Sequence, residues 1–262
     1  MKNKNPGLAL FTFLVYVFLL GPLVIIAVTS FEPGTVLKFP PTGFSLRWYK
    51  NIFEVDMFMS TFKTSILVSL LGNLIAILLG IPAAYALNRA SFKGKETLNA
   101  LFLSPLLIPG IVLGFTLLKY VVITFHIPVY AALLIGHTVI MLPFIIRVIG
   151  SSLAGFDFAI EEAALSLGSS RLSTFFKVVL PNIKSGIIAS VLLAFLESFN
   201  NVDISLFMTG PGVSTLPIQM LTYVENYFDP TIAAISVLLM LITAGFMFLI
   251  ERLLGLTYFT KQ

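Results

Sequence analysis

The sequence contains no cysteine and little charge. None of its 262 residues is Cys, and charged types make up 11 % of them, against about 25 % in an average soluble domain. Without cysteine the chain can form neither a disulfide nor a thiolate metal site. The remaining composition is 58 % hydrophobic, with a mean hydropathy of +1.00. These values predict an integral membrane protein, and a soluble all-α protein with a large core is the much weaker alternative.

Charge is missing from long stretches of the chain. Asp, Glu, Lys and Arg are absent from residues 5–31, 64–88, 97–118, 120–146 and 230–250. Each stretch is long enough for a membrane-spanning helix, which needs roughly 20 apolar residues. The stretches are continuous and do not alternate with polar residues, which favours helices over a β-barrel.

A sixth candidate span is interrupted by Glu197 and Asp203. With it, we predict an all-α, polytopic membrane protein with six transmembrane helices, in a single domain of residues 1–262. The predicted spans are about 8–31, 62–87, 98–119, 129–149, 184–208 and 231–252. Between the first two, the prolines and Trp48 of residues 32–60 predict an interfacial loop with a short surface helix.

Basic residues predict the orientation. With both termini in the cytoplasm, eleven of the sixteen Lys and Arg residues lie inside and five lie outside. The positive-inside rule favours this orientation. The net charge of +4 follows from the same asymmetry and requires no nucleic-acid partner.

Motifs for covalent chemistry are missing from the sequence. It has no Gly-x-x-x-x-Gly-Lys-[Ser/Thr] loop, so the chain is not expected to bind ATP, and it has neither a Gly-x-Ser-x-Gly elbow nor a His-Glu-x-x-His pair. His126 and His137 are isolated, and we expect them to be packed or hydrogen-bonded. The sequence predicts no catalytic residue and no metal site.

The most polar patterned stretch is residues 158–181, which predicts a helix, a turn and a second helix. Gly168 supplies the stop, Ser169 or Ser170 can cap the second helix, and Pro181 ends it. Each predicted helix has one apolar face, formed by Ile160, Ala163, Ala164 and Leu167 and by Leu172, Phe175, Phe176 and Val179. One interpretation is an amphipathic loop on lipid headgroups. A protein partner suits the acidic first helix better, because an interfacial helix is normally rich in lysine.

This stretch resembles a known motif. Glu162-Ala163-Ala164, three residues, Gly168, nine residues and Val178-Val179-Leu180-Pro181 is similar to the EAA motif of ABC importer permeases, with Val178 in place of isoleucine. The resemblance extends over the chain through its length, its six spans, and the residues Thr209-Gly210-Pro211-Gly212 and Leu216-Pro217. Within that family the chain is most similar to the second permease subunit of spermidine/putrescine transporters.

The resemblance implies a type I (MetI-like) importer bundle in the bacterial plasma (inner) membrane. It implies a heterodimer with a second permease subunit, two ATP-binding subunits and an external solute-binding protein. ATP and Mg would be bound by the ATP-binding subunits, and this chain would carry no cofactor. The residues implied to couple to the ATPase are Glu162, Ala163, Ala164, Gly168, Leu180 and Pro181.

Polar residues in the fifth predicted span suggest a substrate path. If residues 184–208 form one helix, four side chains share an arc of about 160°; these are Glu197, Asn200, Asn201 and Asp203. A carboxylate at the bilayer centre costs roughly 2.5–3.5 kcal/mol, so such residues usually face a cavity or a partner. We expect a polar wall of the path here, with hydrogen bonding across the permease dimer as the alternative. Pro109, beside Gly110, is expected to open a second wall.

The substrate is less well defined by the residues. Polyamine permeases often carry paired Asp where this chain has Asn200 and Asn201, and an acid where it has Gly110. Polyamine is therefore the first choice, narrowly ahead of aminophosphonates, opines and amino-acid-like compounds. A stand-alone secondary transporter or channel is the rival class, and a membrane enzyme is a weaker one.

Overall fold

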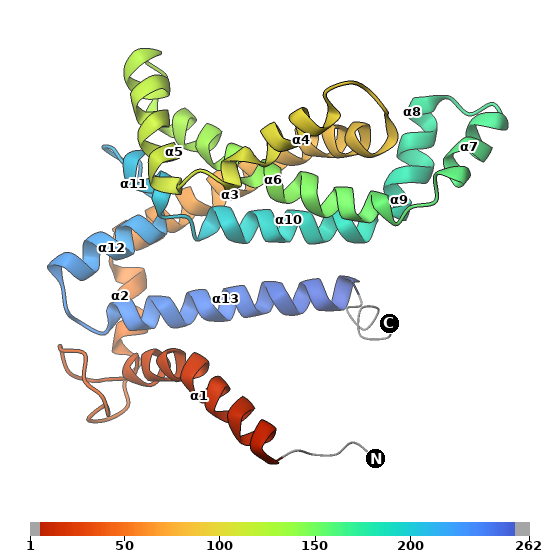
Figure 1. Cartoon of the computed structure of the whole chain (residues 1–262). Coiled ribbons are helices and arrows are strands. Elements are labelled where there is room, and N and C mark those ends of the chain that lie inside the picture. The colour runs from red at the N-terminus through yellow and green to blue at the C-terminus, as the bar shows by residue number, and fades with distance from the viewer. Residues whose placement is uncertain (1–5, 255–262) are drawn as a thin grey trace. The chain divides into compact units, whose positions relative to one another are not determined.

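The computed structural model describes residues 6–254. In this range the chain folds into helices joined by loops, with one isolated antiparallel bridge between Gly210 and Val213 (Figure 1). This confirms the predicted all-α class. The α-helices are α1 (Pro6–Thr29), α2 (Arg47–Glu54), α3 (Asp56–Arg89), α4 (Lys95–Leu103), α5 (Gly110–Leu117), α6 (Val129–Ala154), α7 (Phe158–Ser166), α8 (Arg171–Thr174), α9 (Leu180–Asn182), α10 (Lys184–Phe199), α11 (Asp203–Phe207), α12 (Leu216–Asn226) and α13 (Thr231–Leu254).

Within residues 6–254, four helices are long and apolar enough to cross a membrane, namely α1, α3, α6 and α13. Two further candidates are bent pairs of helices, so the described chain has six spans when each pair counts as one. In the first pair, residues Lys95–Leu106 and Gly110–Thr124 are bent by 94°. The predicted span of about 98–119 is thus not a straight helix, because the chain leaves helical structure before Pro109, and Pro109 directly precedes α5.

The predicted span 184–208 is also not one helix. α10 ends at Phe199, residues 200–202 lie outside the helices, and α11 begins at Asp203. The amides at the break bond to nearby backbone: Asn200 Nδ2 donates to Leu196 O at 3.0 Å, and Asn201 Oδ1 accepts from Ile204 N at 3.0 Å. Such local bonds compete with a continuous helix. The single polar face expected from helical spacing is therefore wrong beyond Phe199.

The contacts divide the described chain into two compact units. One comprises Thr61–Ile218 and the described residues from Gly245 onwards, and its core lies along α3, α6 and α10. Small residues allow the helices of this unit to approach closely. A Cβ added at Gly80 would lie 2.6 Å from Ile145 Cγ2, and one added at Gly72 would also collide with α6.

The other unit comprises the described residues up to Ser60 and Gln219–Ala244. It contains α2, which confirms the short helix expected within residues 32–60.

Glu32 organises the loop that precedes α2: its carboxylate accepts hydrogen bonds from the Thr42 side chain and from the backbone N–H groups of Thr42 and Gly34. These bonds, led by the one from the Thr42 side chain, lower the pKa of Glu32 below its ordinary value. The Trp48 indole donates to the Glu32 carbonyl at 2.7 Å.

Candidate functional site

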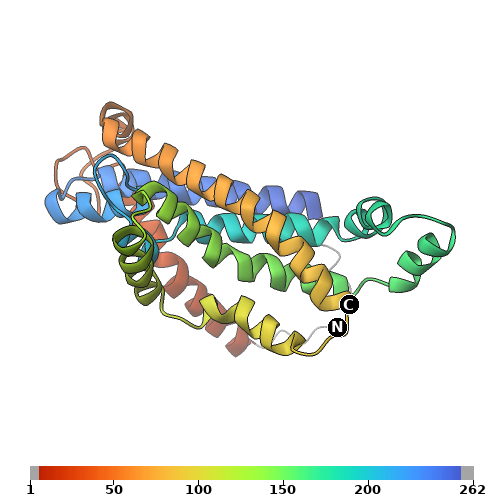
Figure 2. The ribbon, with the colours of Figure 1, turned by 90° about the horizontal axis from the view of Figure 1, so that it is seen from above.

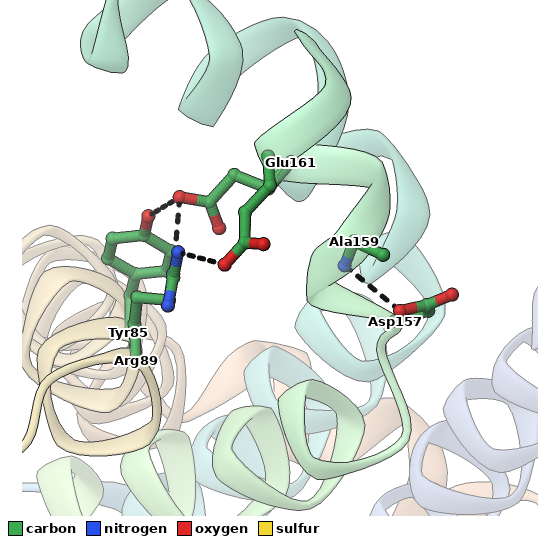
Figure 3. Close-up of polar contacts among 6 residues, drawn as sticks. Tyr85, Arg89, Asp157, Ala159 and Glu161 are labelled. Atoms are coloured by element: carbon green, nitrogen blue, oxygen red, sulfur yellow. Dashed lines mark hydrogen bonds and ion pairs between the residues drawn. The ribbon is translucent and has the colours of Figure 1, made fainter. Parts of the chain in front are cut away.

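Residues 158–181, here called the coupling segment, form the helix–turn–helix that the sequence predicted. The first helix, α7, starts at an Asp157 cap, whose Oδ1 accepts from Ala159 N at 2.9 Å (Figure 3). It ends at Ser166, and Gly168, two residues later, has a φ of +89°. Ser169 N donates to Ala164 O at 3.1 Å and Gly168 N to Leu165 O at 3.0 Å, the two bonds of a Schellman motif. The backbone at Gly168 thus favours glycine over residues with a branched Cβ.

The second half of the segment starts at Ser170, as expected. The Ser170 hydroxyl accepts from Ser173 N at 3.3 Å and caps α8. The helix continues as a π-helical stretch over Phe175–Val179 and then as α9, which contains Pro181. The chain bends by 73° between residues Arg171–Asn182 and α10. α7 and α8 consequently project beyond the neighbouring ends of α6 and α10 (Figures 1 and 2).

Two side chains of α3 hold the coupling segment. Tyr85 Oη donates to Glu161 Oε1 at 2.6 Å, and Arg89 Nη2 pairs with Glu162 Oε1 at 2.9 Å (Figure 3). Arg89 Nε also lies 3.6 Å from Glu161 Oε1. Glu161 is 5 % exposed, so its carboxylate depends on these partners. No motif in the sequence marks Tyr85 or Arg89 as part of this site, because they lie more than 70 residues from the EAA-like motif.

The coupling segment divides into a buried face and an exposed face. Phe175 packs against Tyr85 with ring centroids 4.9 Å apart, and Val179 is fully buried. Leu167 and Leu172 are 90 % and 70 % exposed. Leu172, together with Arg171, lines part of a cavity of about 780 Å³ between α3 and the segment. Large exposed apolar side chains on a segment that projects beyond the neighbouring helix ends indicate an interaction surface.

The residues of the EAA-like motif are distributed over both faces. Glu162, Ala163, Gly168 and Pro181 are exposed, whereas Ala164 and Leu180 are half-buried. Among the described residues, no atom comes within 4 Å of a Cβ added at Gly168. Substitution there would therefore strain the backbone without causing a collision.

The residues predicted to line a substrate path lie at the break after α10. Glu197, Asn200 and Asp203 are exposed and Asn201 is half-buried. Glu197 lies in the last turn of α10 and Asp203 is the first residue of α11, so the two carboxylates flank the break. This location is the other end of α10 from the coupling segment (Figures 1 and 2).

The structure brings both predicted walls of the path together. Helix α11 packs on α5, which follows Pro109: a Cβ added at Gly110 would collide with the Asp203 side chain, and one added at Gly114 would lie 2.9 Å from the Asp203 carbonyl oxygen. The space that a larger residue at position 110 would need is thus filled by Asp203. The site combines an exposed carboxylate pair, two amides and the interrupted helix at Pro109.

The isolated histidines have different surroundings. His137 is buried and hydrogen-bonded to two serines, which confirms the expectation that it is hydrogen-bonded. His126 Nδ1 lies 3.1 Å from Thr124 O in an exposed turn.

Comparison with known proteins identifies the family. Residues 76–256 match the family of binding-protein-dependent transport system inner membrane components. The chain is 30 % identical over 244 residues to the putrescine transport system permease protein PotI of Escherichia coli (strain K12), covering 90 % of this chain and 86 % of that protein. It is 28 % identical over 236 residues to the spermidine/putrescine transport system permease protein PotC of Haemophilus influenzae, covering 89 % and 90 %.

Solved structures show the same fold. A chain of a bacterial ABC transporter that imports the acidic polysaccharide alginate superimposes with a TM-score of 0.69, at 15 % identity, covering 99 % of this chain and 98 % of that one. A chain of a bacterial alginate ABC transporter in complex with its pentasaccharide-bound periplasmic protein gives a TM-score of 0.73, at 13 % identity, covering 98 % and 94 %.

Permeases of this kind work together with ATP-hydrolysing subunits and a binding protein, and they are not themselves the enzyme. The chain belongs to the family of binding-protein-dependent transport system inner membrane components and is a permease subunit of an ABC importer.

Proposed function

We propose that this permease subunit forms half of the path by which an ABC importer takes up polyamines of the spermidine/putrescine type. The observation that carries the proposal is the exposed carboxylate pair, Glu197 and Asp203, at the break between α10 and α11. Carboxylates in a spanning region are costly and usually serve a pathway. They complement a solute that carries two or more ammonium groups.

The similarity to PotI and PotC, which are named as polyamine permeases, supports the same substrate class. Asn200 and Asn201 supply neutral amides, which can donate and accept hydrogen bonds with amine groups. Aminophosphonates, opines and amino-acid-like compounds are the competing solutes, because amides also suit uncharged polar groups.

The coupling segment transmits the ATP-driven motion in this proposal. Its exposed leucines, Leu167 and Leu172, dock on an ATP-binding subunit, and its buried face transfers the movement to α3 and α10. The motif residues that take part are Glu162, Ala163, Ala164, Gly168, Leu180 and Pro181. Alternating access follows from tilting of the spans against those of the partner permease.

The remaining parts of the proposal concern assembly and orientation. The partner permease is a different chain, so the pore is a heterodimer, and residues 1–262 act as one permease domain. Two ATP-binding subunits hold ATP and Mg, and an external binding protein delivers the solute. Both termini face the cytoplasm, in agreement with the distribution of basic residues.

Uptake into proteoliposomes tests the proposal. The chain is reconstituted with its partner permease, ATP-binding subunits and binding protein, and accumulation of labelled putrescine and spermidine is measured with and without ATP inside the vesicles. ATP-dependent accumulation of either polyamine is expected. Labelled 2-aminoethylphosphonate and octopine represent the competing solutes.

Each other outcome overturns a defined part of the proposal. ATP-dependent uptake of a competing solute, without uptake of polyamine, would overturn the substrate class and leave the permease role intact. Polyamine uptake by the permease pair without the ATP-binding subunits would instead indicate a secondary transporter.

A further inference from the structure

Four buried polar side chains form a continuous chain of hydrogen bonds through the larger unit. His137 Nε2 lies 3.0 Å from Ser205 Oγ, and His137 Nδ1 lies 2.7 Å from Ser198 Oγ. Ser198 Oγ in turn lies 3.0 Å from Ser69 Oγ. None of the four side chains belongs to a residue that is more than 2 % exposed. These hydrogen bonds link α11, α6, α10 and α3.

The donor and acceptor groups of these four side chains match one another. A neutral imidazole has one donor and one acceptor nitrogen, and a serine hydroxyl can donate and accept. Either imidazole tautomer can therefore satisfy both Ser198 and Ser205. Because water is absent from a bilayer interior, a buried polar group without a partner is costly there. A fully satisfied buried network consequently favours one arrangement of the helices.

The position of His137 relative to the break is the informative feature. Ser198 lies two residues before Asn200, and Ser205 lies two residues after Asp203. His137 therefore bonds to the chain on both sides of residues 200–203. Its neighbour Gly136 brings α6 close to α11, since a Cβ added there would lie 2.8 Å from Ile204 Cγ2.

We propose that His137 is a positioning residue of the translocation path. Its two ring nitrogens fix Ser198 on α10 and Ser205 on α11, and thereby hold residues 200–203 in place against α5. The assignment of this break to the path rests on the proposed function. The positioning role itself concerns only how the break is held and can be measured without transport.

Loss of the imidazole should loosen the break without unfolding the chain. In a His137→Leu variant, the serines can bond to backbone carbonyls of their own helices, and leucine fills most of the vacated volume. The two sides of the break then lose their common partner. A His137→Gln variant keeps a side chain that can donate and accept, and it should restore the position in part.

The absence of cysteine gives a direct probe. Val202, which lies in the break, is 37 % exposed, and Val202→Cys places a single thiol there because the sequence has no other. We measure the alkylation rate of this thiol in the assembled permease pair with a soluble maleimide. Because the break loosens, His137→Leu should raise that rate roughly five- to tenfold, the range expected when a buried hydrogen bond is lost. His137→Gln should stay within about twofold of the parent.

Asn73→Leu is the matched control. Asn73 is 3 % exposed and its Nδ2 donates to Val191 O at 2.6 Å, so it joins α3 to α10 away from the break. It should lower the thermal stability of the complex without changing the alkylation rate. Ser205→Ala, a smaller change, removes only the bond to α11 and should reproduce the effect of His137→Leu if that variant accumulates poorly.

Two results would overturn the positioning role. One is an unchanged alkylation rate in both His137→Leu and Ser205→Ala. The other is an equal change in Asn73→Leu, which would reveal general loosening of the bundle. If the rates respond as expected while neutralising Glu197 and Asp203 has no effect on uptake, the positioning role stands and the assignment of the path falls.

Discussion

The chain is interrupted at both ends of α10, and the two interruptions are specified differently. Before Lys184 it turns through the coupling segment, where Asp157, Gly168 and Ser170 cap or stop successive helices by bonds within a few residues. After Phe199 the break contains neither glycine nor proline. Local bonds of two asparagines contribute there, but the partner that reaches both sides is His137 on α6. One end is encoded locally, and the other depends on tertiary contacts.

The largest expected effect is at Gly168. Because this end of α10 is encoded locally, the shape of the coupling segment should depend on a single residue. Gly168→Val places a β-branched residue at a φ of +89°, which costs at least about 1–2 kcal/mol. The variant should insert normally, fail to co-purify with the ATP-binding subunits and lose uptake. Gly168→Asn is the control, because asparagine tolerates this conformation. Full uptake by the valine variant would refute local control of the coupling segment.

A second effect concerns the attachment of the coupling segment to α3. Arg89→Gln removes the pairs with Glu161 and Glu162 and leaves the buried Glu161 carboxylate with Tyr85. Because Arg89 is partly exposed, the expected loss of stability is only about 1–2 kcal/mol. ATP hydrolysis stimulated by the binding protein should fall more than basal hydrolysis.

The control for that variant is Lys50→Gln, which breaks the exposed pair with Glu54 and should leave both hydrolysis rates unchanged. Equal stimulation in the Arg89 variant and the parent would show that the attachment to α3 has no part in coupling.

The third prediction concerns charge at the break after α10. Glu197→Gln combined with Asp203→Asn should raise the KM for putrescine about tenfold, equivalent to about 1.4 kcal/mol, because two carboxylates facing a cationic solute are neutralised. Vmax should change less. Glu225→Gln neutralises an exposed carboxylate on α12 and serves as the control. An unchanged KM would remove Glu197 and Asp203 from the path.

The smallest expected effect is in the loop held by Glu32. Like the coupling segment, this loop is held by bonds between residues that are close in the sequence. The pKa of Glu32 is lowered, first of all by the hydrogen bond from the Thr42 side chain. The carboxylate therefore stabilises the loop above its ordinary pKa near 4.5, and this contribution is lost as the pH falls through the lowered value. Hydrogen exchange at the Gly34 and Thr42 amides, corrected for intrinsic rates, should show protection falling only on strong acidification. Glu32→Gln should lack that dependence, and identical profiles would contradict the role of the carboxylate.

The same distinction explains what the sequence could predict. Charge-free runs revealed the spans, and the caps with Gly168 revealed the coupling segment, because those signals act over a few residues. Helical spacing failed beyond Phe199, since it assumes a continuous helix and Asn201 instead bonds to the first turn of α11. Tyr85, Arg89 and His137 acquire their roles only when distant helices meet. The juxtaposition of Asp203 with Gly110 likewise depends on tertiary packing.

Protection of single thiols at the two regions tests the central claim most directly. Leu167→Cys places a thiol on the coupling segment at a residue that is 90 % exposed, and Val202→Cys places one at the break. Alkylation of each is compared in the permease pair with and without the ATP-binding subunits, in the absence of nucleotide. We predict strong protection of the thiol at position 167 and little change at position 202. Unchanged alkylation at position 167 in a complex that contains the ATP-binding subunits would contradict the claim that this segment is where the importer couples to its ATPase.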